Sequence, residues 1–510
     1  MKNFYSKCSK CLVLLLISSI AILLFLPMQA AANSPPSNTS LFCNSPSLMP
    51  PHPNLLEEIR KGHGPLGALL AEEPEPSPIG AMQAVPGPNN VLVLLVNFTD
   101  NPAATPPVFF DTLVFSNALG AKSVRNYYRE VSYNTIDIVT VNLPGTLGWF
   151  LMPSTYAFYV AGNFGFGAYP NNAQRLTEDA VAAADPVVNF ANYDNNGDGS
   201  VDALCIVHAG PGAEFTGIPN QIWSHKWNTS VPQAVDGVNV FDYAMMPEYW
   251  LVPGDMTSGV FDHELGHVFG APDLYDTDFS SNGVGSWCLM SYGAWNGPGN
   301  LGSDPAHPCA WIRQLFGFVT PTNVTVDLPG QSIPSVESTA VSSVYRLWQG
   351  GAVGPEYFLV ENRQQTGFDT WLPGNGILIW HIDETQPNND NEFNYLVDLE
   401  EAHGGVQHLQ AAVNPGDPND PFPGGTGNTL FDDSTDPNAN AYSGSPTNIA
   451  VDNISNSGDP MTGDLLVGIT QALVTGYNTY WLLFTAISVT LAGGYLILMR
   501  KRRFCLNQKQ

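Results

Sequence analysis

The sequence is poor in basic residues and in cysteine, and each shortage excludes a class of protein. Its 510 residues include 18 Lys and Arg against 46 Asp and Glu, a formal net charge of −28 at pH 7. Contacts with nucleic-acid phosphates need clustered Lys and Arg, so nucleic acid is excluded as a partner. Seven cysteines are too sparse for a dense disulfide framework, although Cys288 and Cys309 are one candidate pair. The acidic surplus suits a soluble surface, calcium binding or both.

Acidic residues are absent from both ends of the chain. Residues 1–32 combine three lysines, an apolar run and a small-residue cleavage site, which predicts a signal peptide. Residues 480–499 carry no charge and precede a basic cluster at 500–503. Twenty such residues span a hydrocarbon core as a helix, and the basic flank favours the cytoplasmic side. We therefore expect an exported chain with a single transmembrane anchor and a cytoplasmic tail at 500–510; whether the anchor is retained or trimmed stays open.

Between these ends, the pattern of apolar residues predicts three parts. Residues 33–88 are rich in Pro, Ser and Asn, which indicates a propeptide or spacer with one short helix at 53–60. Residues 89–318 form the expected catalytic domain, in which strands and helices mix around an active-site helix. Residues 319–475 show strand and turn signals without helical periodicity, which predicts an all-β, sandwich-like domain. The expected fold class is α+β.

Several elements of the expected catalytic domain can be placed from periodicity. The uninterrupted apolar run 91–98 has the length of a buried strand, and strands are also expected at 135–141 and 201–207. Amphipathic helices are expected at 123–130 and at 171–184, the second ended by an Asp-Pro pair.

The segment His263-Glu-Leu-Gly-His267 carries the strongest chemical signal. On a helix the two histidines lie one turn apart on the same face, so both imidazoles can reach one zinc ion. Glu264 lies beside them, where a carboxylate can take a proton from a metal-bound water. Gly270 permits a sharp turn, after which Asp273 arrives where the longer zinc-protease motif has its third ligand. The pattern predicts zinc bound by His263, His267 and Asp273, with Glu264 as the general base.

A second segment, 285–293, follows the predicted metal ligands. Zinc proteases with the extended motif have a methionine-containing turn beneath the metal, and Met290 is the candidate for that position. Tyr292 is the second candidate catalytic residue, because its phenol could stabilise the oxyanion of the tetrahedral intermediate. The alternative for Tyr292 is a packed aromatic side chain with a hydrogen-bonded hydroxyl.

A stretch of acidic and small residues at 194–202 resembles a calcium loop. Oxygen donors occupy alternate positions, and glycine at the sixth position permits the sharp bend such loops need. The twelfth position is Cys205 instead of glutamate, so the stretch is not a complete EF-hand. The alternative is a solvated turn rich in Asp and Asn. The predicted ligands of a structural calcium ion are Asp194, Asn196, Asp198, Ser200 and Asp202.

The motif from Asp262 to Asp276, together with 287–291 and 372–383, resembles the immune inhibitor A family of secreted zinc peptidases. This resemblance implies a metzincin-like catalytic domain, zinc, calcium and endopeptidase activity on extracellular proteins. Two departures are evident. His403 stands where an aspartate is expected, which argues against a metal site in that segment. The family is mostly released into the medium, whereas this chain is expected to be anchored to the outer face of the cell membrane.

These observations predict an exported zinc endopeptidase made as a zymogen and acting on proteins or peptides. Two alternatives from other classes stay open: a cell-surface adhesin with an inactive protease-like domain, and a glycan-binding protein that uses its β-rich half. The sequence determines neither the substrate, nor the processing site, nor the oligomeric state.

Overall fold

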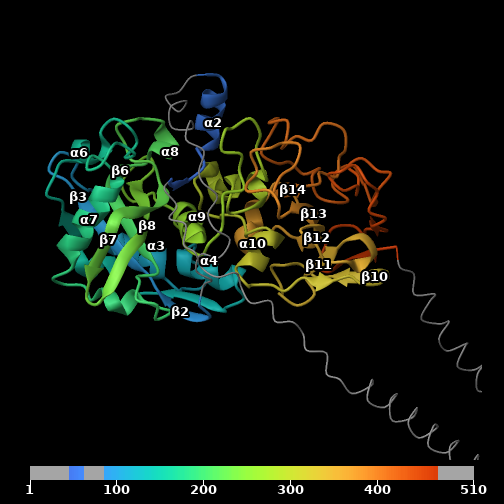
Figure 1. The fold of residues 1–510 in the computed structure, drawn as a ribbon, viewed down its shortest axis with the longest axis horizontal. Helices are drawn as coiled ribbons and strands as arrows, with labels where there is room; N and C mark the ends of the chain where they lie inside the picture. The colour runs from blue at the N-terminus through green and yellow to red at the C-terminus, as the bar shows by residue number, and fades with distance from the viewer. Residues whose placement is uncertain (1–44, 63–84, 469–510) are drawn as a thin grey trace, which may run out of the picture. The chain divides into compact units, whose positions relative to one another are not determined.

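The computed structural model describes residues 45–62 and 85–468 (Figure 1). The expected signal peptide at 1–32, the expected anchor at 480–499 and the tail at 500–510 lie outside these residues. Within the described part of the chain, no helix combines the length and the apolar character needed to cross a membrane.

The first half of the described chain is organised around a six-stranded mixed sheet, ordered β1-β7-β8-β6-β3-β5. Strands β5, β3, β6 and β8 run parallel, whereas β7 is antiparallel to β8 and β1 is antiparallel to β7. A parallel pair, β2 and β4, lies beside this sheet. The strands are β1 (Ser47–Leu48), β2 (Gly87–Asn90), β3 (Leu92–Asn97), β4 (Ile136–Val139), β5 (Trp149–Leu151), β6 (Leu204–Pro211), β7 (His225–Val235) and β8 (Val238–Tyr249).

Strand β3 shows why the apolar run 91–98 has no polar alternation. Side chains of successive strand residues point to opposite faces, so Leu94 enters one core and Leu95 the other. Helices α6 and α7 contribute to the first core, and α3, α4 and α9 to the second. The helices are α2 (Pro53–Arg60), α3 (Val108–Phe115), α4 (Val124–Val131), α5 (Pro144–Leu147), α6 (Tyr156–Val160), α7 (Ala173–Ala184), α8 (Ala213–Thr216), α9 (Ser258–Val268) and α10 (Ala310–Leu315).

Side-chain caps fix the start of the two predicted amphipathic helices. Ser123 accepts a hydrogen bond from the Asn126 amide at the start of α4, and Asn172 accepts one from the Arg175 amide at the start of α7. Both helices therefore begin within two residues of the predicted positions. Strand β6 begins three residues later than predicted, because Val201 still belongs to the 194–202 loop and its amide donates to the Asn239 carbonyl.

The second half is β-rich, as predicted: between residues 319 and 468 the structure has strands and 3-10 turns but no α-helix. Within that range the strands form a five-stranded sheet, β14-β13-β12-β11-β9, and a four-stranded sheet, β10-β17-β16-β15. The strands are β9 (Thr322–Asn323), β10 (Leu328–Ile333), β11 (Val344–Leu347), β12 (Glu356–Arg363), β13 (Gly376–Asp383), β14 (Val397–Leu399), β15 (Phe431–Asp432), β16 (Ala450–Asp452) and β17 (Met461–Leu466).

The five-stranded sheet is buried on both faces and joins the two halves. Phe358 and Ile379 enter a core shared with the four-stranded sheet. Leu359 and Trp380, one position along each strand, enter the same core as α9 and α10. Figure 1 accordingly shows α9 and α10 between the strands of the first sheet and those of the β-rich half.

The predicted disulfide between Cys288 and Cys309 is wrong. Cys205, Cys288 and Cys309 are buried free thiols in the described chain. Cys288 and Cys309 are neighbours nonetheless, because the Cys309 amide donates to the Cys288 sulfur at 3.2 Å.

A buried network of charges crosses the boundary between the halves. Arg363 of β12 contacts Asp369 through two hydrogen bonds, Nε–Oδ2 at 2.8 Å and Nη2–Oδ1 at 2.7 Å. Arg313 of α10 donates to Glu361 of β12, and all four side chains are fully buried. Burial alone would raise the pKa of Asp369, but the Arg363 guanidinium outweighs it and holds that pKa well below its usual value. Arg363 also donates to the Trp287 carbonyl at 3.3 Å, which links the β-rich half to the segment carrying Met290.

Replacing Arg363 by Met should leave the buried Asp369 carboxylate without its guanidinium partner and Glu361 with Arg313 alone. We expect the free energy of unfolding to fall by about 3–5 kcal/mol, measured by urea denaturation with tryptophan fluorescence. The matched control is Arg129→Met, because the Arg129 side chain is 36% exposed and its ion pair with Asp137 is long, at 3.8 Å. That change should cost at most about 1 kcal/mol. Equal effects of the two substitutions would contradict a stabilising role of the buried network.

Candidate metal centre

Helix α9 is buried along its whole length, and two glycines shape its surroundings. A Cβ on Gly266 would lie 2.5 Å from the Met290 sulfur, so only glycine lets the Met290 segment pack against this helix. Gly270 has a φ of +95°, a left-handed conformation that side chains disfavour. The Ala271 amide then donates to the Gly266 carbonyl at 3.0 Å. This tight turn brings Asp273 back to the face of α9 that carries the histidines.

Three candidate ligand atoms converge at that face. The Nε2 atoms of His263 and His267 are 3.1 Å apart. The Asp273 Oδ1 atom lies 3.3 Å from the first and 3.2 Å from the second. A tetrahedral zinc ion with bonds of about 2.0–2.1 Å separates its ligand atoms by about 3.3 Å. The structure therefore brings the three predicted ligands together with the spacing of a zinc site.

The hydrogen bonds of the two imidazoles leave their Nε2 atoms available to a cation. His263 Nδ1 lies 2.9 Å from the Leu289 carbonyl and His267 Nδ1 lies 2.8 Å from the Ala271 carbonyl. A carbonyl only accepts, so each Nδ1 donates, and each neutral ring presents a lone pair at Nε2. Burial lowers the pKa of His263, which favours the neutral ring. Two lone pairs and one carboxylate oxygen facing one point in a buried site require a positive charge between them.

Glu264 follows His263 on α9 and is fully buried. Neither carboxylate oxygen has a hydrogen-bond partner in the described part of the chain. Burial, with the negative charges of Asp273 and Glu214 as further causes, raises the pKa of Glu264 well above its usual value. A divalent cation held by the neighbouring ligands would favour the ionised carboxylate. An ionised carboxylate without other partners is suited to accept a proton from a water molecule.

The segment after the ligands packs under the site. The Leu274 amide donates to the Met290 carbonyl at 2.8 Å, which joins the segment after Asp273 to the segment that carries Met290. Tyr292 is 1% exposed, and its hydroxyl has no hydrogen-bond partner among the described residues. The structure therefore lacks the hydrogen bond to the Tyr292 hydroxyl that the alternative interpretation of this residue expected among the described residues. The Tyr292 ring lies 6.1 Å from that of Tyr275.

Two buried residues near the site were missed by the sequence analysis. Tyr275 lies within the quoted motif, but its hydroxyl donates to the Leu48 carbonyl, 227 residues away. Glu214 accepts hydrogen bonds from the amide and hydroxyl of Ser224, and burial raises its pKa to about 7. The local sequence does not mark either residue as part of the site, because the neighbours of each come from segments that meet only in the folded chain.

The predicted calcium loop forms a compact turn. Asp194, Asp198 and Asp202 each place one carboxylate oxygen within 4.8 Å of the others. Several of these oxygens accept hydrogen bonds from within the loop, for example Asp194 Oδ2 from the Gly199 amide at 3.0 Å. Burial raises the pKa of Asp202 to about 6. This geometry suits both a calcium loop and a turn rich in Asp and Asn, so calcium binding stays a prediction.

Comparison with known proteins identifies the region around the site. Residues 107–318 match the immune inhibitor A peptidase M6 catalytic domain. This region of the chain is similar to the M6 catalytic domain. The match runs from the start of α3 to beyond α10 and includes every candidate zinc ligand. The resemblance inferred from the motifs is thereby confirmed, and zinc is the metal expected of M6 peptidases.

Two curated relatives are similar over the same region. The chain is 29% identical over 282 residues to the pre-pro-metalloprotease PrtV of Vibrio cholerae, covering 45% of this chain and 29% of that protein. It is 32% identical over 212 residues to immune inhibitor A of Bacillus thuringiensis subsp. alesti, covering 34% of this chain and 29% of that protein. The similarity thus spans less than a third of the length of either relative.

The geometry of this site predicts a specific change in zinc content. His267→Ala removes one of three ligands, so the full chain should retain one zinc ion fewer than wild type after zinc loading and gel filtration, by elemental analysis. Glu264→Gln leaves all three ligands in place and is the matched control, with zinc content unchanged. Equal zinc content in wild type and His267→Ala would show that these histidines hold no ion.

Proposed function

We propose that the chain is a zinc endopeptidase that hydrolyses peptide bonds of extracellular proteins. The observation that carries this proposal is the convergence of three ligand atoms, from His263, His267 and Asp273, within 3.3 Å of one another beside the buried carboxylate of Glu264. Zinc bound there would polarise the scissile carbonyl and lower the pKa of the attacking water toward ~7.

The side chains around the ligands supply the proton transfers. Glu264 takes a proton from the attacking water and gives it to the leaving amine as the peptide bond breaks. Tyr292 is the second catalytic residue of this proposal: its hydroxyl has no hydrogen-bond partner among the described residues and would stabilise the oxyanion. Met290 fills the space against Gly266 and supports the ligand-bearing helix from below.

The arrangement of elements supports a metzincin-like catalytic domain at 89–318. The features that support it are four parallel strands, the antiparallel strand β7, the ligand-bearing helix α9 and the segment that carries Met290. A sandwich-like domain at 319–475 is supported by the core shared between the five-stranded and four-stranded sheets. Export through residues 1–32 and anchoring through residues 480–499 belong to the same proposal. A structural calcium ion at 194–202 is its remaining part.

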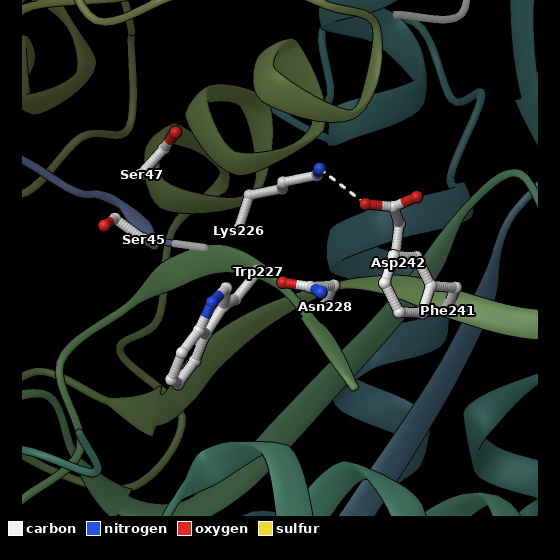
Figure 2. Close-up of a pocket in the computed structure, with 7 residues that line it drawn as sticks. All are labelled: Ser45, Ser47, Lys226, Trp227, Asn228, Phe241 and Asp242. Carbon is white, nitrogen blue, oxygen red and sulfur yellow. Dashed lines mark hydrogen bonds and ion pairs between the residues drawn. The ribbon is translucent and has the colours of Figure 1, made fainter. Parts of the chain in front are cut away.

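The chain is made as a zymogen in this proposal, with the N-terminal segment 45–62 as the inhibitory part. Strand β1 is the edge of the sheet and pairs with β7 in antiparallel register, with Leu48 opposite His225. Figure 2 shows Ser45 and Ser47 of this segment beside Lys226 and Trp227 of β7, around a pocket of about 30 Å³. A peptide substrate adding to a sheet edge makes the same backbone hydrogen bonds.

Further contacts hold the segment beside the metal ligands. The Met49 amide donates to the Ser224 carbonyl at 3.0 Å, and the Trp223 indole donates to the Met49 carbonyl at 2.7 Å. The Leu48 carbonyl accepts from Tyr275, which is two residues beyond Asp273. The Vibrio cholerae relative is named a pre-pro-metalloprotease, which supports a pro-segment in this chain.

The general-base role of Glu264 predicts a separation of binding from catalysis. Glu264→Gln should retain zinc and native stability but lose cleavage of casein by at least about 10²–10⁴-fold, since the proton acceptor is removed. Activity is measured with and without a chelator. Cleavage by this variant at the wild-type rate would refute the assignment.

The zymogen proposal predicts activation by cutting between residues 62 and 85. A chain with an engineered cleavage site in that interval should gain activity on casein after cleavage and removal of the freed segment. A synthetic peptide of residues 45–62 added back should inhibit it. The control peptide carries Met49→Pro, which removes the amide that donates to the Ser224 carbonyl and should inhibit much more weakly. Equal inhibition by both peptides would contradict docking by strand addition.

A further inference from the structure

A second group of metal-binding side chains lies in the β-rich half. Glu401, His403 and Asp420 each place one ligand atom within 4.8 Å of the others. His403 Nε2 is 3.1 Å from Glu401 Oε2 and 3.9 Å from Asp420 Oδ1. Glu401 and Asp420 are fully buried, and the His403 side chain is 11% exposed.

The tautomer of His403 is set by its neighbour. His403 Nδ1 lies 2.7 Å from the Gly404 carbonyl, so Nδ1 donates and the neutral ring presents a lone pair at Nε2. That Nε2 atom and Asp420 Oδ1 are both buried, and neither has a hydrogen-bond partner among the described residues. An unprotonated Nε2 at 3.1 Å from the Glu401 carboxylate oxygen is unfavourable without a cation between them.

Surrounding donors hold both carboxylates in place. Glu401 accepts from the amides of His408 and Leu409. Asp420 Oδ2 accepts from the Trp287 indole at 2.9 Å, which leaves Oδ1 directed at the cluster.

We propose that Glu401, His403 and Asp420 bind a second divalent transition-metal ion of the zinc class. An imidazole nitrogen with two carboxylate oxygens is a zinc donor set, whereas calcium prefers sites made entirely of oxygen. In the sequence, His403 argued against a metal site in this segment. In this proposal the histidine instead favours a zinc-class ion over calcium. This second site is independent of the proposed peptidase activity.

The position of the cluster indicates a structural role for the ion. It would join the 401–409 loop to residue 420, whose backbone already pairs with Ala402 at 2.9 Å. Through the Trp287 indole it would also brace the segment that leads to Met290. The ion would thus connect the β-rich half to the turn beneath the catalytic ligands.

Elemental analysis of the full-length chain after zinc loading and gel filtration tests the proposal. We expect two zinc ions per wild-type chain, one in His403→Ala, one in His267→Ala and none in the double variant. The matched control is His408→Ala, whose ring lies 4.3 Å from that of His403 but whose Nδ1 contacts Asp417. This control should retain both ions.

The outcomes separate the two sites. If wild type and His403→Ala hold the same amount of zinc, the second site does not exist and a proton shared between Glu401 and His403 explains the contact. If His403→Ala loses zinc and His267→Ala does not, the second metal site is supported and zinc binding at the peptidase site is contradicted. Should His403→Ala not fold, crystals of the wild-type chain decide, because anomalous scattering at the zinc edge must show a peak about 2.0–2.1 Å from His403 Nε2. Absence of that peak in zinc-loaded crystals overturns the proposal.

Discussion

The burial of three lone-pair atoms at one point is the constraint on which the centre of this molecule depends. Two imidazole nitrogens and one aspartate oxygen lie within 3.3 Å of one another in a nearly solvent-free site. A cation among the ligands and fixed partners behind them would stabilise such an arrangement. The Leu289 and Ala271 carbonyls are those partners, and both belong to segments that must approach α9 closely. Gly266 and Gly270 make that approach possible.

The β-rich half is part of this support. Its five-stranded sheet shares a core with α9, and its buried Arg363 donates to the Trp287 carbonyl in the turn that carries Met290. The indole of the same tryptophan donates to Asp420 in the proposed second metal cluster. The turn beneath the ligands is therefore held from the β-rich side by a guanidinium and a carboxylate. A peptidase site of this design depends on both halves of the described chain.

The local sequence was sufficient to predict helices and strands whose limits are set by short-range periodicity or by a capping residue. The apolar run 91–98 contains β3, and Ser123 and Asn172 cap the two predicted amphipathic helices. The short helix expected at 53–60 is α2, with the same limits. The predicted start of strand β6 was wrong, because Val201 belongs to the preceding loop. The sequence also gave no indication that alternate faces of β12 and β13 would pack against different partners.

The sequence by itself determined the residues of the proposed catalytic centre, because His263, Glu264, His267 and Asp273 lie within eleven residues and helix geometry places the histidines together. Only the tertiary structure decided what surrounds them. Tyr275 meets Leu48 across 227 residues, and Asp420 meets Trp287 across 133. The physical reason is the range of the interactions: ligand spacing is set by one helical turn, whereas burial and the partners of buried polar atoms are set by segments that meet only when the whole chain is folded.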